Sequence, residues 1–245
     1  MCYSYTTPNF RREGEKIRLA GLQKLTLIDY PGKMACIVFT VGCNFKCPFC
    51  HNASLVNGTD DYIDEESILE FLNKRKGILE GVVITGGEPL LNSDIGEFIK
   101  KIKELGYPVK LDTNGTNPKL LKELVSKNLV DYVAMDIKNT IENYTLATGD
   151  IKLDLNAINE SIDFLLQDIV DYEFRTTVVK GIHTTQDIVS IAKRINNAKR
   201  YYLQQYKPSE ENLSPDGLSE FSKEEMNVFL LEASKYTLNV NLRGL

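Results

Sequence analysis

The chain has 245 residues, of which 42% are hydrophobic and 26% are charged, an ordinary composition for a globular domain. Its formal net charge of −5 argues against a nucleic-acid-binding protein, because phosphates are bound by clustered lysine and arginine. No apolar run approaches the 18 residues that a membrane span needs. The N-terminal residues lack an apolar signal core, so we expect a cytoplasmic protein that binds neither nucleic acid nor membrane.

Three of the five cysteines, Cys43, Cys47 and Cys50, lie within eight residues. Clustered cysteines in a cytosolic chain more often hold metal or perform redox chemistry than form disulfides. The other two stand apart. Cys36 lies in an apolar run and is expected to be a small buried hydrophobe, and Cys2 is near the N-terminus. We expect neither to take part in a site.

Short apolar runs alternate with helical patterns along most of the chain. Residues 22–33 alternate in polarity and then turn at Pro31 and Gly32, which is typical of a strand or hairpin. Six buried strands are then predicted, at residues 35–41, 81–85, 108–113, 131–138, 172–180 and 200–206. Helical spacing predicts helices at residues 64–79, 93–106, 117–128, 155–168, 184–196 and 222–236.

This alternation predicts βαβ units around a parallel sheet. An eight-fold barrel usually takes about 250 residues, and six units are present, so the expected fold is a partial (β/α)6 TIM-like barrel. We expect an N-terminal tail at 1–18 and a single domain at 19–245. Within that domain the barrel spans about 35–206, and a C-terminal helix and strand lie in 220–245.

Polar residues recur where successive strands end. The three cysteines follow the first strand, and the next ones end in "TGGEP", "LDTNG", "MDIK", "RTTVVKG" and "QQYK". Because the carboxyl ends of barrel strands share one face, we expect these residues to form one site.

The spacing C-x3-C-x2-C leaves three interpretations open. Structural zinc would need His51 or a distant residue as a fourth ligand, and no second ligand pair is present. A reactive thiol pair does not explain the third cysteine. A [4Fe–4S] cluster on three thiolates would leave one iron open to an added ligand, and the spacing with its place after a strand favours this interpretation.

The motif of Cys43, Cys47, Phe49 and Cys50 resembles the signature of the radical S-adenosylmethionine (radical SAM) superfamily. The "CHN" after the third cysteine and the "DYPGK" before the motif are similar to those of glycyl-radical-enzyme activases. The likeness runs from about residue 19 to residue 206. It implies that S-adenosylmethionine binds the open iron and is cleaved to methionine and a 5′-deoxyadenosyl radical.

The same resemblance assigns Gly86, Gly87 and Glu88 to the methionine amino group of S-adenosylmethionine. Adjacent glycines let backbone approach a ligand closely, and a carboxylate accepts hydrogen bonds from an ammonium. The alternative is a strand-to-helix turn with a glutamate at the start of the helix.

The resemblance also implies that Asp112, Thr113 and Asp136 hold a monovalent cation beside the cofactor. Lys138 would then neutralise the cofactor carboxylate or bind its ribose. Carboxylates on neighbouring strands repel unless a cation or a lysine joins them. An ordinary ion pair at the barrel rim is the alternative.

Arg175 lies within a predicted strand, where a charged side chain needs a partner. By resemblance it contacts the cofactor's carboxylate or ribose, and Thr177 lines the adenine side. An outward-facing arginine is the alternative, since alternation alone does not fix its face. The sequence leaves the roles of His51 and Lys207 open.

By resemblance, the substrate is a backbone glycine of a partner glycyl-radical enzyme, in an anaerobic setting with an electron donor such as flavodoxin or ferredoxin. The short segment between the cysteines and the second strand leaves no room for a ferredoxin-like insertion. The "DYPGK" and "VNLRGL" segments favour anaerobic ribonucleoside-triphosphate reductase as the partner, with pyruvate formate-lyase as the alternative.

Two other classes remain open. A small-molecule radical SAM enzyme similar to 7-carboxy-7-deazaguanine synthase would need a pocket for its substrate. A zinc-binding interaction module would use the three cysteines for structure alone.

Overall fold

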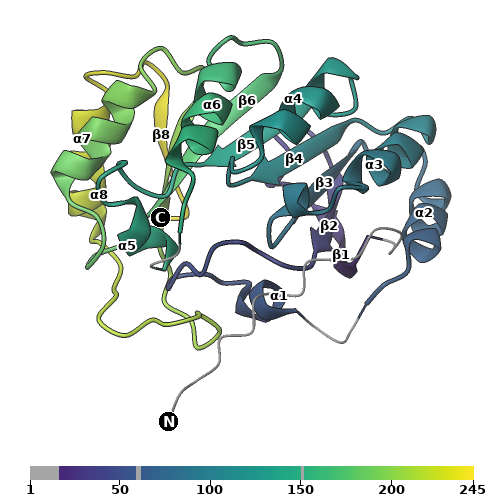
Figure 1. Cartoon of the computed structure of the whole chain (residues 1–245), viewed down its shortest axis with the longest axis horizontal. Helices are drawn as coiled ribbons and strands as arrows, with labels where there is room; N and C mark the ends of the chain where they lie inside the picture. The colour runs from purple at the N-terminus through teal and green to yellow at the C-terminus, as the bar shows by residue number, and fades with distance from the viewer. Residues whose placement is uncertain (1–16, 59–61, 150–151) are drawn as a thin grey trace.

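A computed structural model describes residues 17–58, 62–149 and 152–245. Cys2 and nearly all of the expected tail at 1–18 lie outside these residues. In the described part of the chain, eight strands form one curved sheet in the order β1 to β8 (Figure 1). β1 (Leu19–Thr26) pairs antiparallel with β2, and every later pair is parallel. The hairpin and the parallel sheet predicted from the sequence are therefore confirmed.

The parallel strands match the six predicted runs to within a few residues and add a seventh at the C-terminus. Their bounds are β2 (Ala35–Thr40), β3 (Gly81–Gly86), β4 (Val109–Thr113), β5 (Tyr132–Asp136), β6 (Asp171–Val178), β7 (Tyr201–Gln205) and β8 (Val240–Arg243). The C-terminal strand expected in 220–245 is β8, which extends the sheet beyond β7.

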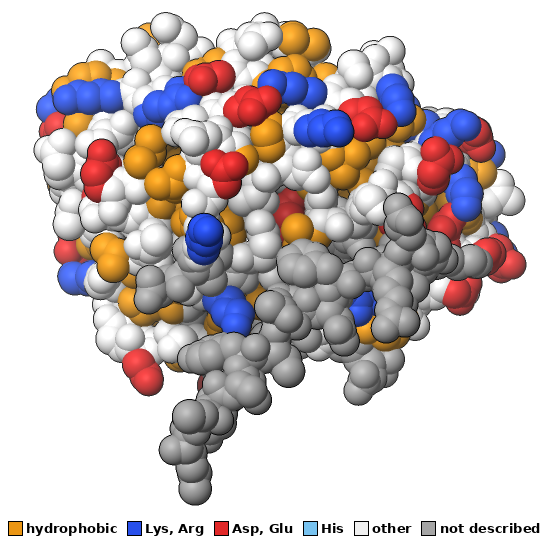
Figure 2. Space-filling view, in the orientation of Figure 1, with side chains coloured by type: hydrophobic (Ala, Val, Ile, Leu, Met, Phe, Trp, Pro, Cys, Tyr) orange, Lys and Arg blue, Asp and Glu red, His pale blue; other side chains and the backbone are white. Residues whose placement is uncertain are grey.

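Helices follow the strands and cover the outer face of the sheet, in chain order along its arc (Figure 1). The six predicted helices are α2 (Glu65–Lys74), α3 (Ile95–Glu104), α4 (Pro118–Ser126), α6 (Leu155–Leu165), α7 (Thr185–Arg194) and α8 (Lys223–Ala233). Three short pieces are additional to the prediction: α1 (Ala53–Asn57), the 3₁₀ turn η1 (Pro89–Leu91) and α5 (Tyr144–Thr148). Charges of both signs are interspersed over the outer helices (Figure 2). None of the helices in the described residues is both long and apolar enough to cross a membrane.

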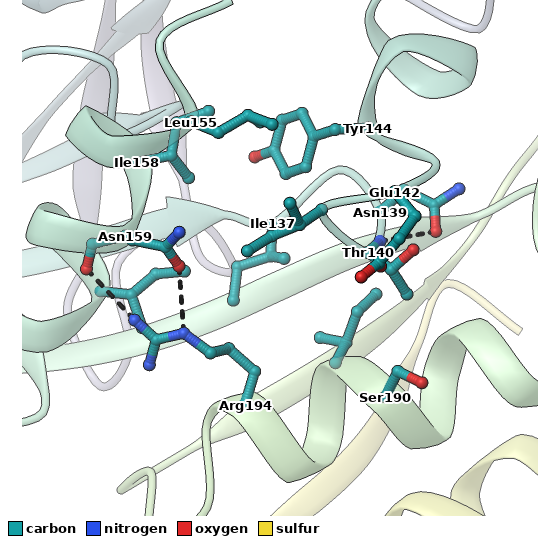
Figure 3. A pocket seen from close by; sticks show the side chains of 13 residues that line it. Ile137, Asn139, Thr140, Glu142, Tyr144, Leu155, Ile158, Asn159, Ser190 and Arg194 are labelled. Atoms are coloured by element: carbon teal, nitrogen blue, oxygen red, sulfur yellow. Dashed lines mark hydrogen bonds between the residues drawn. The ribbon is translucent and has the colours of Figure 1, made fainter.

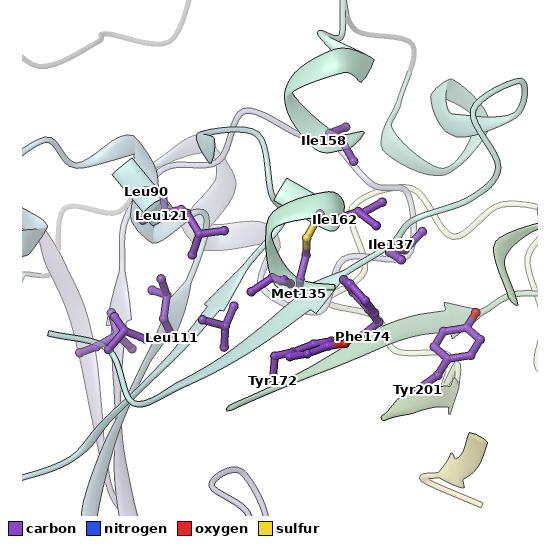
Figure 4. Close-up of a cluster of buried hydrophobic side chains, with 14 of the residues drawn as sticks. Leu90, Leu111, Leu121, Met135, Ile137, Ile158, Ile162, Tyr172, Phe174 and Tyr201 are labelled. Atoms are coloured by element: carbon purple, nitrogen blue, oxygen red, sulfur yellow. The ribbon is translucent and has the colours of Figure 1, made fainter. Parts of the chain in front are cut away.

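The hydrophobic core lies between the sheet and these helices. Strand side chains alternate between the two faces, so Leu111, Met135 and Phe174 point outward. They meet helix residues such as Leu121 and Ile162 in one buried cluster (Figure 4). The side chains on the inward face of the sheet point away from this core.

Tyr30, in the hairpin turn after β1, packs where the parallel strands begin. Its ring is 4% exposed and lies 6.1 Å from the ring of Tyr132, in a small apolar cluster with Ile37 and Val83. Gly81 makes room for it, because a Cβ there would lie 2.9 Å from the Tyr30 ring. This end of the barrel is closed by apolar side chains, so the polar inward face opens at the carboxyl ends of the strands.

His183 connects the segment after β6 to the end of β5. Its Nδ1 accepts a hydrogen bond from the Val179 backbone N–H at 3.1 Å, so Nε2 carries the proton and donates to the Lys138 carbonyl at 2.8 Å. The side chain is 4% exposed, and burial lowers its pKa, although its hydrogen bonds and nearby Asp187 act in the opposite direction. His183, the histidine that lies outside the cysteine motif, therefore holds the segment after β6 against the end of β5.

The His183 contacts predict how stability depends on pH. An unfolded histidine titrates near 6.5, and the folded pKa is lower, so between these values the unfolded state binds more protons. The free energy of unfolding therefore falls as pH drops below about 6.5, by at most about 1.4 kcal/mol per pH unit from this one group. In His183→Gln this contribution is absent. Urea unfolding of both proteins at several pH values between 5 and 8 measures it, and a difference between them that stays constant with pH would contradict the assignment.

Candidate functional site

One cavity of about 270 Å³ lies at the carboxyl ends of the strands. Its lining includes every residue that the sequence predicted to bind a cluster or a cofactor: Cys43, Cys47, Phe49, Cys50, Gly86, Gly87, Glu88, Asp112, Thr113, Asp136, Lys138, Arg175 and Thr177. These residues come from the ends of β3, β4, β5 and β6, from the residues just after β3 and β5, and from the loop after β2. The strand ends therefore converge on one cavity, as expected from the sequence.

The loop after β2 carries the three thiols and is held by backbone hydrogen bonds. Gly42 N–H donates to the Leu55 carbonyl at 2.8 Å, and Lys46 N–H donates to the Thr148 carbonyl at 2.9 Å. Burial raises the pKa of Cys43 to about 12 and that of Cys47 to about 11. Thiols of this kind are protonated at neutral pH, and they become thiolates when a metal compensates their charge.

The donor set fits an iron–sulfur cluster. Thiolates that share one tetrahedral zinc with 2.3 Å bonds lie about 3.8 Å apart. Among the described residues, no three His, Cys, Asp or Glu side chains are grouped to hold a single ion. The three cysteines instead line one side of a wider cavity, and cysteine thiolates are the usual ligands of [4Fe–4S] clusters. Cys43, Cys47 and Cys50 would therefore hold the cluster.

Two later segments fix the cysteine loop from outside. Gly149, at the end of α5, packs against the Lys46 carbonyl so closely that a Cβ would lie 2.3 Å from its oxygen. Asn212 donates from Nδ2 to the Phe49 carbonyl at 3.3 Å, and Ser214 N–H donates to the Pro48 carbonyl at 2.9 Å. Neither segment was predicted to contribute, because contacts to backbone carbonyls leave no motif in the sequence.

Gly86 and Gly87 allow the loop after β3 to pack directly against the end of β2 and the cysteine loop. Gly87 N–H donates to the Thr40 carbonyl at 2.9 Å, and Glu88 N–H donates to the Gly42 carbonyl at 2.8 Å. A Cβ on Gly87 would lie 2.0 Å from the Gly42 oxygen, and one on Gly86 would lie 2.3 Å from the Thr40 oxygen. The sequence predicted close approach to a ligand, and the structure adds the close approach of the loop after β3 to the cysteine loop.

Glu88 is almost fully buried, at 1% exposed, and its carboxylate accepts three hydrogen bonds. The Thr113 hydroxyl donates to Oε1 at 2.7 Å, Asn114 N–H donates to Oε2 at 2.6 Å, and Leu90 N–H donates to Oε1 at 3.1 Å. The last bond caps η1, so the alternative of a glutamate at the start of a helix describes part of its role. Burial raises the pKa of Glu88 to about 7 despite these donors. A carboxylate has about four acceptor positions, so one remains for a cation in the cavity.

A chain of alternating charges crosses the inward face from β4 to β6. Arg175 donates from Nε to Asp136 Oδ1 at 2.8 Å and from Nη1 to Asp112 Oδ2 at 3.1 Å. Lys138 donates to Asp136 Oδ2 at 2.9 Å, and Lys110 forms an ion pair with Asp112. Arg175 thus faces inward, and the outward-facing alternative is wrong.

These ion pairs set the charge states of the site. Burial alone would raise the pKa of Asp136, but Arg175 and Lys138 outweigh burial and hold it well below its ordinary value. Arg175 and Lys110 lower the pKa of Asp112 in the same way. Three side-chain cations therefore face two aspartates, which leaves one positive charge in excess, so charge balance does not require a monovalent cation between the aspartates.

Several contributing residues were not selected from the sequence. Lys110 is 1% exposed and lies two residues before Asp112 on the same face of β4, so strand alternation was the signal that identifies it. Asn114 donates from Nδ2 to Asn44 Oδ1 at 2.8 Å and so joins the loop after β4 to the cysteine loop. Gln204, quoted in "QQYK", also lines the cavity.

Cys36, His51 and Lys207 differ in how they relate to the cavity. Cys36 is fully buried in β2, as predicted. His51 lines the cavity, and its Nδ1 lies 3.4 Å from Asn212 Nδ2. Lys207 is exposed and is not part of the cavity lining.

A second cavity, of about 220 Å³, lies outside the barrel between the segment after β5 and helices α6 and α7 (Figure 3). Isoleucine side chains such as Ile137 and Ile158 form much of its lining. Arg194 closes one side by donating to the side-chain and backbone oxygens of Asn159 at 3.0 and 3.3 Å. Among the described residues, none of those predicted to bind the cluster or cofactor lines this cavity.

Known proteins with similar sequences support the interpretation of this cavity as a site for a cluster and a cofactor. Residues 37–201 match the sequence model of the radical SAM superfamily. A protein of Methanocaldococcus jannaschii, named provisionally as a glycyl-radical enzyme activating enzyme, is 36% identical over 202 residues, which cover 80% of this chain and 82% of that protein. The pyruvate formate-lyase-activating enzyme of Clostridium pasteurianum is 25% identical over 197 residues, which cover 77% of this chain and 82% of that enzyme.

The fold is also similar to that of a solved structure. The crystal structure of Streptococcus suis SuiB bound to S-adenosylmethionine is similar with a TM-score of 0.66 and 15% identity, covering 83% of this chain and 48% of SuiB. Radical SAM proteins are enzymes that use a [4Fe–4S] cluster and S-adenosylmethionine, so these are the cofactors of this chain, and the interpretation as a zinc-binding interaction module is wrong. The chain belongs to the radical SAM superfamily, in its group of glycyl-radical enzyme activating enzymes.

Proposed function

We propose that this chain generates a glycyl radical on a partner enzyme, and that the partner is anaerobic ribonucleoside-triphosphate reductase. The observation that carries the proposal is that one cavity is lined by the three thiols, by Glu88 and by the ion-paired residues around Arg175. When bound, the cluster supplies one electron that breaks a carbon–sulfur bond of S-adenosylmethionine, leaving methionine and a 5′-deoxyadenosyl radical. The protein binds and orients the reactants and keeps water away from them.

The charged residues of the cavity suit the polar end of S-adenosylmethionine. Glu88 has one acceptor position left for the amino group. An arginine has five N–H donors, so Arg175 retains donors for a carboxylate after binding Asp112 and Asp136. Lys138 is adjacent and positively charged, because Asp136 outweighs the effect of burial and raises its pKa. Thr177 and Phe49 complete the lining toward the base and the cluster.

The size of the cavity favours a macromolecular substrate. Pockets for single small molecules typically measure about 300–1,000 Å³, and this one, at about 270 Å³, also has to accept S-adenosylmethionine. A second substrate would therefore have to enter across the rim, where the cavity opens to solvent. A glycine on a protein loop, which enters from the rim, meets this constraint better than the substrate of an enzyme similar to 7-carboxy-7-deazaguanine synthase.

The "DYPGK" and "VNLRGL" segments support the reductase as partner, and the likeness to the Clostridium pasteurianum enzyme supports pyruvate formate-lyase as the second candidate. The proposal places the chain in the cytoplasm under anaerobic conditions, with flavodoxin or ferredoxin as the electron donor. Residues 19–245 would act as one domain, with the strands of one sheet running from β1 to β8.

The first prediction concerns the cluster ligands. Cys47→Ala removes one of three thiolates, so the reconstituted and reduced protein is expected to lose 5′-deoxyadenosine formation down to the level of an iron-free control. Chromatography of the product under anaerobic conditions measures it. Cys36→Ala is the matched control, since Cys36 is buried in β2 away from the cavity, and it should retain the activity. Stoichiometric zinc with no cluster and no 5′-deoxyadenosine in the wild type would return the cysteines to a structural role.

The second prediction concerns the partner. The 5′-deoxyadenosyl radical takes a hydrogen atom from a glycine Cα, so one 5′-deoxyadenosine forms for each glycyl radical. With the reductase labelled at glycine with deuterium, we expect a glycyl signal in electron paramagnetic resonance and deuterium in the 5′-deoxyadenosine. Parallel reactions with pyruvate formate-lyase decide between the two partners. Deuterium transfer from pyruvate formate-lyase alone would replace the first partner with the second.

A further inference from the structure

Glu173 is a fully buried carboxylate that does not line the cofactor cavity. It lies on β6 two residues before Arg175, so both side chains point to the inward face of the sheet. Its Oε2 accepts a hydrogen bond from the Tyr132 hydroxyl at 2.8 Å. A buried charge of this kind is costly unless a cation pairs with it.

Arg243, on the C-terminal strand β8, supplies that cation. Its Nη1 donates to Glu173 Oε1 at 2.9 Å and its Nη2 donates to Oε2 at 3.3 Å, which is a bidentate pair. The guanidinium lies over the ring of Tyr202, 3.8 Å from its centroid, and so crosses β7 to reach β6. The pair joins two residues that are 70 positions apart in the sequence.

Without Arg243, the cation next to Glu173 on its own strand is Arg175. Glu173 already contributes to the electrostatic field that favours the charged form of Arg175. The long, flexible arginine side chain would turn toward the unpaired carboxylate, because a buried charge without a partner is the costlier state. Its contacts with Asp136 and Asp112 at the cavity would then be lost.

We infer that Arg243 is a positioning residue: by pairing with Glu173, it keeps Arg175 directed toward Asp112 and Asp136 at the cofactor cavity. The C-terminal strand thereby sets the affinity for S-adenosylmethionine without contacting it. The effect on affinity rests on the proposed contact between Arg175 and the cofactor, whereas the effect on the direction of Arg175 does not.

The test compares four proteins: the wild type, Arg243→Met, the double variant Glu173→Gln/Arg243→Met, and Arg194→Met. In the double variant both partners are neutral, so Glu173 no longer competes for Arg175. Arg194 pairs with Asp163 at 2.7 Å on the outer helices and is the matched control for removing an arginine from an ion pair. Crystal structures of the cofactor-free chains locate the Arg175 guanidinium. Anaerobic equilibrium dialysis with labelled S-adenosylmethionine, on protein with an oxidised cluster, measures affinity without turnover.

In Arg243→Met we expect Arg175 to turn toward Glu173 and the dissociation constant for S-adenosylmethionine to rise by about tenfold or more. In the double variant both properties return close to those of the wild type, and Arg194→Met leaves both unchanged. The inference is overturned if Arg175 still binds Asp136 in Arg243→Met, or if the double variant binds as weakly as the single one.

Two further outcomes of the experiment would also be decisive. If Arg243→Met does not fold, Arg243→Gln takes its place: it is also neutral, so it should weaken binding in a way that Glu173→Gln reverses, and unchanged binding would contradict the inference. If the wild type itself does not bind S-adenosylmethionine, the proposed function fails, and the crystal structures still decide whether Arg243 directs Arg175.

Discussion

The guanidinium of Arg175, held between the carboxylates of Asp112 and Asp136, is the interaction on which the site depends. It joins the ends of β4, β5 and β6, and each charge in it is buried enough that removing a partner would be costly. The parallel sheet makes this possible, because it brings the ends of strands that are distant in sequence to neighbouring positions. Lys110 and Lys138 complete the chain of charges at its two ends. The polar end of the cofactor cavity is therefore held together by ion pairs within the protein.

The two ends of the barrel have opposite characters for the same reason. Where the strands begin, Tyr30 and Tyr132 fill the interior with apolar rings. Where the strands end, charged residues and thiols occupy it. Tyr132 connects the two regions, since its ring faces Tyr30 and its hydroxyl binds Glu173. This polarity leaves the carboxyl ends of the strands as the face at which a ligand is bound.

The sequence predicted the strands, the main helices and the convergence of the strand ends on one cavity, and the reasons are local. Apolar runs of five or six residues mark buried strands, and residues at their ends must converge in a parallel barrel. The pairing partners were beyond local patterns: Arg243 and Glu173 are 70 residues apart, and Asn212 contacts the backbone of Phe49. Helix α5 has five residues, which is too short for a helical period to show. Where several cations and carboxylates are available, spacing does not decide which of them pair.

The contact between Gly87 and Gly42 limits how this protein can vary over evolutionary time. Any side chain at position 87 would occupy the space of a backbone carbonyl, which no rotamer change can vacate. A substitution there has to be accompanied by a change in the path of the cysteine loop, so the two loops are inherited as a unit. The outer helices make no part of this contact, so a substitution on them is free of the constraint.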